Sequence, residues 1–366
     1  MLADLNEFQI AGCPVRVGGS SPEALQQLLL SQFMGNSPVY VLTDSNTRKH
    51  CYPVLQRHVP ALSEAICLEA EAGEQNKTLQ TCERIWMQMA ESGGNRNSLL
   101  INLGGGVITD LGGFAASVFH RGMPFINIPT TLMAMVDASL GGKTGVDLHG
   151  LKNQIGLFAN PAAILVWPGF LDTLPEREIL SGAAEICKHA LIADAGMWDK
   201  IVKGSKEPLL WKEYILPAIK IKTGIVSSDP LEQGSRRLLN FGHTLGHAIE
   251  TWSLRNDAIP LTHGEAVAAG MVCETRISAQ IAGLPAEEAD TVTDFLIRRF
   301  GHYPMNEDAI ASIARLSVYD KKNRNGKHLL SLLRSVGQAA DGIPCEPRLI
   351  AESLRFYASY TQSFFY

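Results

Sequence analysis

Two histidines at a spacing of four residues are the first sign of chemistry in the sequence. They lie in the segment Asn240-Phe-Gly-His243-Thr-Leu-Gly-His247. Residues four apart share one face of a helix, and two imidazoles placed in this way can chelate a metal ion. His263 and Glu185 are further candidate ligands in the same half of the chain. A carboxylate with two imidazoles is a common catalytic zinc set, so we predict a metal site, although any one histidine could instead be a core residue or a helix cap.

Polar residues continue upstream of the histidine pair at helical spacing. Arg236, Asn240, His243 and His247 follow one another at steps of four, three and four residues, which predicts a single helix face. Burying such a face is costly unless it lines a polar cleft or contacts a ligand. The pattern therefore indicates a binding site, and a solvated helix face is the alternative.

Three consecutive glycines follow a β-rich segment in the N-terminal half. Residues 99–103 run directly into Gly104, Gly105 and Gly106, and Asp110 lies one turn into the helix-forming stretch that comes next. Glycines let the backbone approach a phosphate closely, and a helix start offers free N–H groups. The run does not follow the G-x-G-x-x-G pattern, so a nucleotide-binding turn and an ordinary tight strand–helix turn both stay open.

A second candidate loop covers residues 129–153. Asp137, Lys143, Lys152 and Asn153 lie in it among small residues. Such a loop suits the oxygens of an anionic substrate. On composition alone, a solvated loop is an equal alternative.

Strand-like and helix-like segments alternate in the first part of the chain. The expected strands cover residues 39–43, 65–68, 99–103 and 125–128, and the expected helical stretches cover residues 53–58 and 78–92. This alternation favours a parallel, doubly wound α/β sheet.

After residue 170 the segments become long and rich in Ala, Leu, Glu and Lys. The expected helices cover residues 177–191, 208–227, 237–252, 264–282, 287–300 and 307–316. We therefore predict two domains, an α/β domain at residues 1–169 and an all-helical domain at residues 170–366.

The composition excludes several classes of protein. A length of 366 residues suits two domains, and a net charge of -5 argues against nucleic acid as a partner. No apolar run approaches the ~20 residues of a membrane helix, and residues 1–12 lack the regions of a signal peptide, so we expect no membrane partner and a cytoplasmic location. The seven cysteines form no CxxC pair, which argues for reduced thiols and against a disulfide framework or a zinc ribbon.

These motifs resemble, in the same order, those of the 3-dehydroquinate synthase family of sugar phosphate cyclases, over roughly residues 40 to 335. The N-terminal match runs through Asp44, Glu74-Gln-Asn-Lys77, Gly104-Gly-Gly-Val-Ile-Thr-Asp110, Pro129-Thr-Thr-Leu132, Gly141-Gly-Lys143-Thr144 and Lys152-Asn153. The C-terminal match runs through Thr173-Leu-Pro-Glu-Arg-Glu178, Glu185 and Lys188, Glu232, Arg236, Asn240, His243 and His247, His263-Gly-Glu265, and Asp320-Lys-Lys322. The resemblance implies a Rossmann-like nucleotide-binding domain followed by a helical metal-binding domain.

The resemblance also assigns cofactors and changes the interpretation of the histidine pair. It implies bound NAD and Zn²⁺ (or Co²⁺), with Glu185, His243 and His263 as the metal ligands. His247 would then face the substrate instead of the metal.

The remaining site residues are implied by the resemblance in three groups. The cofactor-binding group is Asp44, Glu74, Lys77, Gly104, Gly105, Gly106, Asp110, Thr130, Thr131, Lys152, Thr173, Leu174 and Glu178. The substrate-binding group is Arg121, Asp137, Lys143, Asn153, Lys321 and Lys322. The catalytic group is Lys188, Lys222, Glu232, Arg236, Asn240 and His247. Arg121 would reach the phosphate bound to a neighbouring subunit, which implies a homodimer.

The implied reaction converts a small phosphorylated sugar acid, 3-deoxy-D-arabino-heptulosonate 7-phosphate, to 3-dehydroquinate and phosphate in the shikimate pathway. It proceeds by NAD-mediated oxidation, phosphate elimination, reduction and intramolecular aldol closure. Two departures from the family are Thr109, where glycine is usual, and a longer segment at residues 252–260.

Three other functions are weighed against this one. Another sugar phosphate cyclase, of the 2-deoxy-scyllo-inosose or valiolone type, would share the fold and cofactors. An iron-dependent alcohol or glycerol dehydrogenase would not explain the phosphate-binding cations. A non-catalytic binding module would not explain the intact set of metal ligands.

Overall fold

The computed structural model describes residues 6–33, 35, 37–148, 151–204, 211–318 and 328–360. Its contacts divide the chain into two compact units, Met1–Pro175 and Glu176–Tyr366. The domain boundary expected from the sequence, between residues 169 and 170, stays a prediction, because a division by contacts does not test whether either part folds alone.

The first unit is built on a mostly parallel sheet. In the part of the chain that the structure describes, seven strands form it in the order β1-β2-β9-β6-β5-β3-β4. The parallel strands are β3 (Val39–Asp44), β4 (Ile66–Ala70), β5 (Leu99–Gly104), β6 (Phe125–Pro129) and β9 (Ala163–Val166). An antiparallel hairpin of β1 (Asn6–Ile10) and β2 (Cys13–Val17) completes one edge. Every residue of β5 and β6 is buried, as expected of central parallel strands.

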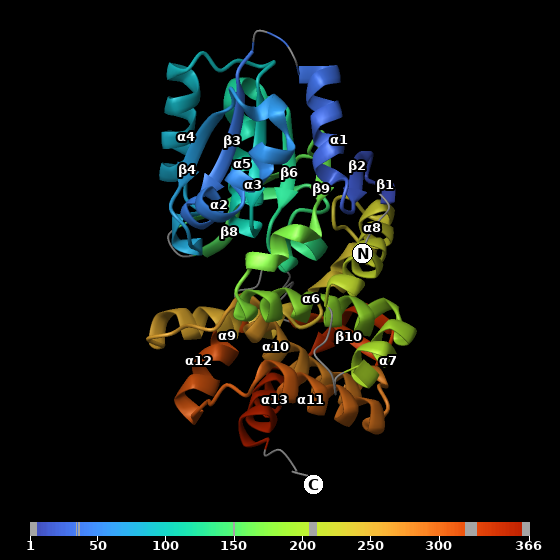
Figure 1. Ribbon diagram of the computed structural model, residues 1–366. Helices are drawn as coiled ribbons and strands as arrows, with labels where there is room; N and C mark the ends of the chain where they lie inside the picture. Colours follow the sequence, from blue (N-terminus) through green and yellow to red (C-terminus); the bar gives the residue numbers. More distant parts are fainter. Residues whose placement is uncertain are drawn as a thin grey trace. The chain divides into compact units, whose positions relative to one another are not determined.

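Helices cover the sheet (Figure 1). They are α1 (Ser21–Leu28), α2 (Ser45–His50), α3 (Tyr52–His58), α4 (Leu79–Glu91) and α5 (Gly106–Val118). α4 and α5 pack on the strands through a core that includes Tyr40, Leu42, Ile85, Leu111 and Phe114. This arrangement confirms the α/β prediction for the N-terminal half.

A second hairpin, of β7 (Lys143–Leu148) and β8 (Leu151–Phe158), packs against α5. It carries much of the loop that was expected to contact an anionic substrate. The unit ends with the 3-10 turn η6 (Pro168–Thr173).

The second unit is mainly helical. Its helices are α6 (Glu176–Ala193), α7 (Ala195–Lys203), α8 (Ile215–Ser228), α9 (His243–Asn256), α10 (His263–Ile277), α11 (Ala286–Phe300), α12 (Glu307–Val318) and α13 (Pro347–Ser359). The helices of the predicted all-helical second domain are confirmed, but this part of the chain is not all-helical, because β10 (His328–Ser335) and β11 (Gln338–Cys345) form an antiparallel hairpin. α10 is buried along almost its whole length and packs against α6, α9, α11 and α13 (Figure 1). Among the described residues, no helix combines the length and the apolar character that crossing a membrane requires.

The single helix expected at residues 237–252 is wrong. Ser235–Asn240 forms the 3-10 turn η9, and α9 begins only at His243. Between them Gly242 adopts a left-handed conformation with φ of 78°, which breaks the helical path and is accessible to glycine without strain. Arg236 and Asn240 therefore do not share a helix face with the histidines.

Candidate active site

Three helices of the second unit approach one another closely because glycines lie where they meet. A Cβ atom on Gly264 of α10 would lie 2.0 Å from the backbone oxygen of Ser181 in α6. A Cβ atom on Gly270 would lie 2.1 Å from the backbone oxygen of Gly242, next to α9. These positions leave no room for a side chain, so glycine allows α10 to pack directly on both neighbours.

The start of α9 is fixed by a carboxylate of α10. Glu274 is fully buried and accepts hydrogen bonds from the backbone N–H groups of Gly242, at 2.7 Å, and Leu245, at 3.2 Å. Gly242 offers no side-chain cap, so Glu274 satisfies N–H groups that the helix itself leaves unpaired. The start of α10 has its own capping box, formed by Thr262 and Glu265.

Capping at both helix starts matters because His243 and His263 are the first residues of α9 and α10. Glu185 projects from the middle of α6 and is 1% exposed. The Nε2 atoms of His243 and His263 lie 3.4 Å and 3.6 Å from Oε1 of Glu185. Ligand atoms about 2.1 Å from a tetrahedral zinc ion lie ~3.4 Å apart, so these three side chains have the spacing of a ligand set.

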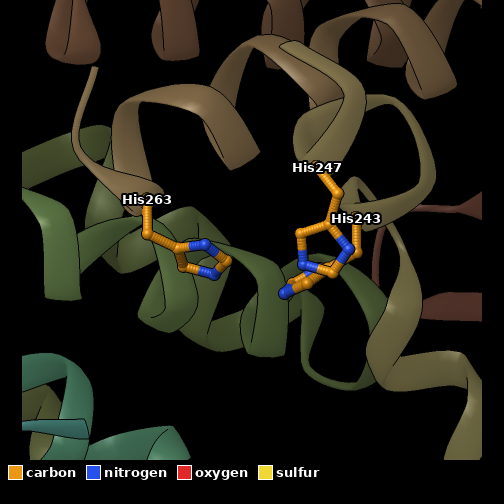
Figure 2. A group of neighbouring side chains, drawn as sticks. All are labelled: His243, His247 and His263. Atoms are coloured by element: carbon orange, nitrogen blue, oxygen red, sulfur yellow. The ribbon is translucent and has the colours of Figure 1, made fainter. Parts of the chain in front are cut away.

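His247 belongs to the same cluster. One ring nitrogen from each of His243, His247 and His263 lies within 4.8 Å of the others, and Figure 2 shows the three rings around a common space. His247 is the exposed member, whereas His243 is buried and His263 is intermediate. Distance alone allows His247 or Glu185 as the third ligand beside the other two histidines, so the assignment of ligands stays a prediction.

Hydrogen bonds at the far side of two rings orient them. Nδ1 of His243 lies 3.1 Å from the backbone oxygen of Phe241, and Nδ1 of His263 lies 3.2 Å from Oε2 of Glu250. Each ring therefore turns Nε2 towards Glu185 when Nδ1 carries the proton. Glu250 had no role in the sequence prediction; its position three residues after His247, on the same helix, is the signal that could have found it.

The surroundings of His243 and His263 shift the pKa values of the two imidazoles in opposite directions. Burial lowers the pKa of His243, and the ammonium of Lys188 lowers it further. Burial also opposes protonation of His263, but Glu250 and Glu185 outweigh it and raise the pKa of His263 to about 9. Lys188 is buried and forms an ion pair with Glu185, one helical turn away on α6.

The loop before α9 carries three more of the predicted residues. Asn240 donates a hydrogen bond to Oε1 of Glu232 at 3.0 Å, and Arg236 is buried with Nη1 2.6 Å from the backbone oxygen of Pro230. Glu232 has a φ of 58°, a strained conformation for a residue other than glycine. Lys222 is buried on α8, which packs against η9.

Asp229 organises this loop, although the sequence prediction did not include it. Its carboxylate accepts hydrogen bonds from the backbone N–H groups of Gln233, at 2.9 Å, Gly234, at 2.7 Å, and Arg236, at 3.0 Å. Three such bonds hold the backbone around Glu232 in its strained shape. An aspartate followed directly by proline and, five residues after the aspartate, by glycine is a turn signal that points to this role.

In the first unit, the glycine run forms a tight turn from β5 into α5. A Cβ on Gly104 would lie 2.5 Å from Cβ of Ile108, and a Cβ on Gly105 would lie 3.0 Å from Thr131. Gly105 is the N-cap of α5 and supplies no side-chain cap, so the backbone N–H groups of the first turn face outward from the helix start. Thr109, the departure from the family pattern, is buried and donates its hydroxyl to backbone oxygens of the same turn.

Lys77 is surrounded by carboxylates. Its Nζ atom lies 2.9 Å from Glu74, 3.5 Å from Asp110 and 3.8 Å from Asp147, and its side chain is 4% exposed. Burial opposes the charge, but the three carboxylates together raise the pKa of Lys77, which keeps it protonated. Lys152 lies 3.7 Å from Glu74, so both predicted lysines meet the same carboxylate.

The tip of the β7–β8 hairpin is joined to this cluster. The backbone N–H of Asn153, at φ of 51°, donates to Oδ1 of Asp147 at 2.8 Å. The backbone N–H of Asp147 in turn donates to the backbone oxygen of Lys77 at 2.8 Å. Predicted cofactor-binding and substrate-binding residues are therefore held together within one unit by Asp147, which the sequence prediction did not include.

Two further predicted residues of the first unit, Asp44 and Arg121, lie outside the Lys77 cluster. Asp44 caps α2, with Oδ1 2.8 Å from the backbone nitrogen of Thr47. Arg121 follows α5, which starts at the glycine turn, so it lies ~20 Å from that turn at 1.5 Å per helical residue. The remaining predicted residues of the described part of the chain lie as follows along the fold: Asp137 in the π-helical turn η5 (Ala134–Ala138), Lys143 exposed at the start of β7, Thr130 and Thr131 after β6, Thr173 and Leu174 at the end of η6, and Glu178 in the first turn of α6. Lys321 and Lys322 lie outside the described residues.

A parallel α/β unit with a glycine turn, followed by a helical unit with a carboxylate and three imidazoles, defines a nucleotide- and metal-binding type of two-part enzyme. Residues 67–181 match the family model for the N-terminal part of 3-dehydroquinate synthase, and residues 182–323 match the model for its C-terminal part. The chain belongs to the 3-dehydroquinate synthase family, as its motifs predicted.

Individual relatives agree with this assignment. The chain is 39% identical to the 3-dehydroquinate synthase of Parabacteroides distasonis over 322 residues, which cover 87% of this chain and 91% of that protein. It is 41% identical to that of Halorhodospira halophila over 289 residues, 77% of this chain and 80% of the relative.

Solved structures of related cyclases share the fold. A 2-deoxy-scyllo-inosose synthase with carbaglucose-6-phosphate, NAD⁺ and Co²⁺ superposes with a TM-score of 0.83 at 24% identity, over 96% of this chain and 99% of that one. A 2-epi-5-epi-valiolone synthase from Streptomyces hygroscopicus, with NAD⁺ and Zn²⁺, gives 0.78 at 26% identity, over 98% and 99%. An iron-containing alcohol dehydrogenase gives 0.67 at 14% identity over 98% of this chain and 100% of that one, so the wider fold extends to that class.

Proposed function

We propose that this protein converts 3-deoxy-D-arabino-heptulosonate 7-phosphate to 3-dehydroquinate and phosphate, with NAD and a divalent metal as cofactors. The observation that carries the proposal is the position of Glu185, with the Nε2 atoms of His243 and His263 at 3.4 Å and 3.6 Å from one carboxylate oxygen. Family membership supplies the reaction, and this arrangement supplies a place for its metal.

Glu185, His243 and His263 would hold Zn²⁺ or Co²⁺. When bound, such an ion lowers the pKa of an alcohol and polarises a carbonyl group. The valiolone synthase contains Zn²⁺ and the inosose synthase contains Co²⁺, which supports an ion at the matching place. Lys188, in its ion pair with Glu185, would help to hold that carboxylate in place beside the two histidines.

His247 serves the substrate in this proposal. It is the exposed histidine of the cluster, and its ring lies 5.2 Å from that of His243, centroid to centroid. An exposed imidazole beside the metal ligands can bind a phosphate oxygen and move a proton near neutral pH. Glu232 and Asn240, hydrogen-bonded to each other, would contact the ring hydroxyls, and Arg236 and Lys222 would contact the carboxylate.

NAD is proposed to bind the first unit at the start of α5. The N–H groups of that helix start suit a pyrophosphate, and Lys77 with its carboxylates suits polar groups of the ribose. When bound, NAD takes up and returns a hydride within one turnover, so the protein has only to hold and orient it. The other proposed contacts are Asp44, Thr130, Thr131, Lys152, Thr173, Leu174 and Glu178.

The substrate phosphate is proposed to contact Lys143, Asn153 and His247. Lys321 and Lys322 belong to this set by resemblance. By the same resemblance, Arg121, which follows α5, would contact the phosphate bound to a neighbouring subunit in a homodimer. The seven cysteines are all unpaired, which supports a reducing, cytoplasmic location.

A side-by-side comparison of three substrates tests the proposed reaction. The protein would be incubated in parallel with the heptulosonate phosphate, glucose 6-phosphate and sedoheptulose 7-phosphate, each with NAD and Zn²⁺, and the carbocyclic products identified by NMR. We expect turnover of the heptulosonate phosphate and little of the other two. Preferential turnover of either other sugar phosphate would assign the protein to a different cyclase activity.

A further inference from the structure

We propose that Glu250 is a positioning residue, which holds the imidazole of His263 in the orientation that metal binding requires. The inference rests on the metal site of the proposed function and adds a residue that the family resemblance did not assign. It concerns how firmly one ligand is held, and it does not make Glu250 a ligand itself.

The geometry separates the two roles. Oε2 of Glu250 lies 3.2 Å from Nδ1 of His263, whereas Oε1 of Glu185 lies 3.6 Å from Nε2 of the same ring. The two nitrogens are different atoms of the ring, and one carboxylate lies against each. Glu250 therefore contacts the nitrogen that does not face Glu185, where a hydrogen bond can fix the ring without competing for the ion.

The contact joins two helices. Glu250 belongs to α9 and has a side chain that is 5% exposed, and His263 is the first residue of α10. In a buried position, a carboxylate that accepts the Nδ1 proton fixes one tautomer, leaves the lone pair on Nε2 and increases the basicity of that nitrogen. These are the properties that a neutral imidazole needs as a ligand.

His243 and His263 differ in how they are held, and this makes the role testable. Nδ1 of His243 lies against a backbone oxygen, that of Phe241, which a side-chain substitution leaves in place. Nδ1 of His263 lies against a side chain. A single substitution at Glu250 therefore removes the orienting contact of one ligand and leaves that of the other.

The test measures metal binding and needs no substrate. Wild type, Glu250→Ala, Glu250→Gln and Glu307→Gln would be stripped of metal, and their affinities for Zn²⁺ and Co²⁺ measured by competition with a chromogenic chelator. Glu307 is an exposed carboxylate of the same unit, paired with Arg355, so its variant matches the change in charge. The visible absorption of the Co²⁺ form would report the geometry around the ion, and circular dichroism would report folding.

We expect Glu250→Ala to lower the affinity for both ions by about 10- to 100-fold, which is the usual effect of losing a hydrogen bond to a metal ligand. The substitution should also alter the Co²⁺ spectrum. Glu250→Gln, nearly isosteric and still an acceptor, should fold like wild type, lose several-fold in affinity and keep more of the spectrum. Glu307→Gln should match wild type.

Wild-type affinity and an unchanged Co²⁺ spectrum in the folded Glu250 variants would overturn the proposal. So would a wild-type protein that binds neither ion, because the metal site itself would then be wrong. A wild-type protein that binds the ions but does not turn over the heptulosonate phosphate would overturn the proposed reaction alone, and the effect of Glu250 on metal affinity would stand.

Discussion

Nε2 of His243 and Oε1 of Glu185 lie 3.4 Å apart, although the two residues come from different helices. α9, which carries His243, and α6, which carries Glu185, are both packed on α10 through glycines. The spacing therefore depends on how closely the backbones approach, and not only on the side chains. Both the chemistry and the packing of this cluster can be tested by substitution.

The two histidines of α9 should differ in their effect on metal binding. His243→Ala removes a buried nitrogen at ligand distance from Glu185, so it should reduce metal affinity by more than the ~10- to 100-fold expected for an outer contact. His247→Ala should keep the metal and lose most of the turnover. Metal content after dialysis and turnover with saturating metal would be measured for both. Equal loss of metal in the two variants would make His247 a ligand.

Gly264→Ala should disturb the packing that brings the ligands together. The added Cβ would lie 2.0 Å from the backbone oxygen of Ser181, and backbone atoms cannot move away as a flexible side chain can. We expect a loss of about 1–3 kcal/mol or more in the free energy of unfolding, measured in urea. Gly224→Ala in α8 is the control, because an added Cβ there meets open space and alanine favours a helix by ~1 kcal/mol. An equal response of the two variants would rule out close packing as the cause.

Asp229→Ala should impair catalysis more than stability. The Asp229 carboxylate accepts hydrogen bonds from three backbone N–H groups around Glu232, and Glu232 itself has a strained φ of 58°. Without the Asp229 carboxylate the loop should relax and move Glu232. We then expect kcat/KM to fall by about 10- to 100-fold, the range that small misplacements of catalytic groups produce. Asp229→Asn, which keeps one oxygen acceptor, should lie between the variant and wild type. Steady-state kinetics that are unchanged in Asp229→Ala would exclude this anchoring role.

Lys77→Met should destabilise the first unit and weaken the binding of NAD. It leaves Glu74, Asp110 and Asp147 close together without the cation between them, which costs about 3 kcal/mol for a buried pair. Lys152→Met removes a more exposed cation, 3.7 Å from Glu74, and should cost less than about 1 kcal/mol. Thermal unfolding and equilibrium titration with NAD would compare the two. Similar stability of both variants would show that the ion pairs of Lys77 do not stabilise the first unit.

The local pattern of the sequence predicted many, but not all, of the regular elements of this fold. Apolar runs predicted the parallel strands β3, β4, β5 and β6 but missed β9 (Ala163–Val166). The spacing of His243 and His247 correctly placed both in one helix. The pattern failed at Gly242, because polar residues at helical spacing can lie on either side of a break, and the left-handed glycine that makes the break is not visible in periodicity. The strand β10 was missed for a related reason: its leucine-rich sequence suits a helix or a strand equally.

The residues that hold the site together were harder to predict than those that could do chemistry. Glu274 caps a helix that begins 31 positions earlier in the numbering, at His243, and Gly264 matters only because Ser181 lies against it. Both roles arise from contacts between segments that are distant in the sequence, so the local spacing of residues does not predict them. Histidine, lysine and arginine, by contrast, suggest chemistry by their type alone.

Release of phosphate from 3-deoxy-D-arabino-heptulosonate 7-phosphate is the most direct test of the proposed function. The protein would be assayed with NAD far below the substrate concentration, with and without a metal chelator, while phosphate and absorbance at 340 nm for NADH are followed together. We expect many phosphates released per NAD, no net NADH, and loss of activity with chelator that Zn²⁺ or Co²⁺ restores. Phosphate release limited to one per NAD, accumulation of NADH, or full activity in the chelator would contradict a metal-dependent cyclase that recycles its nucleotide.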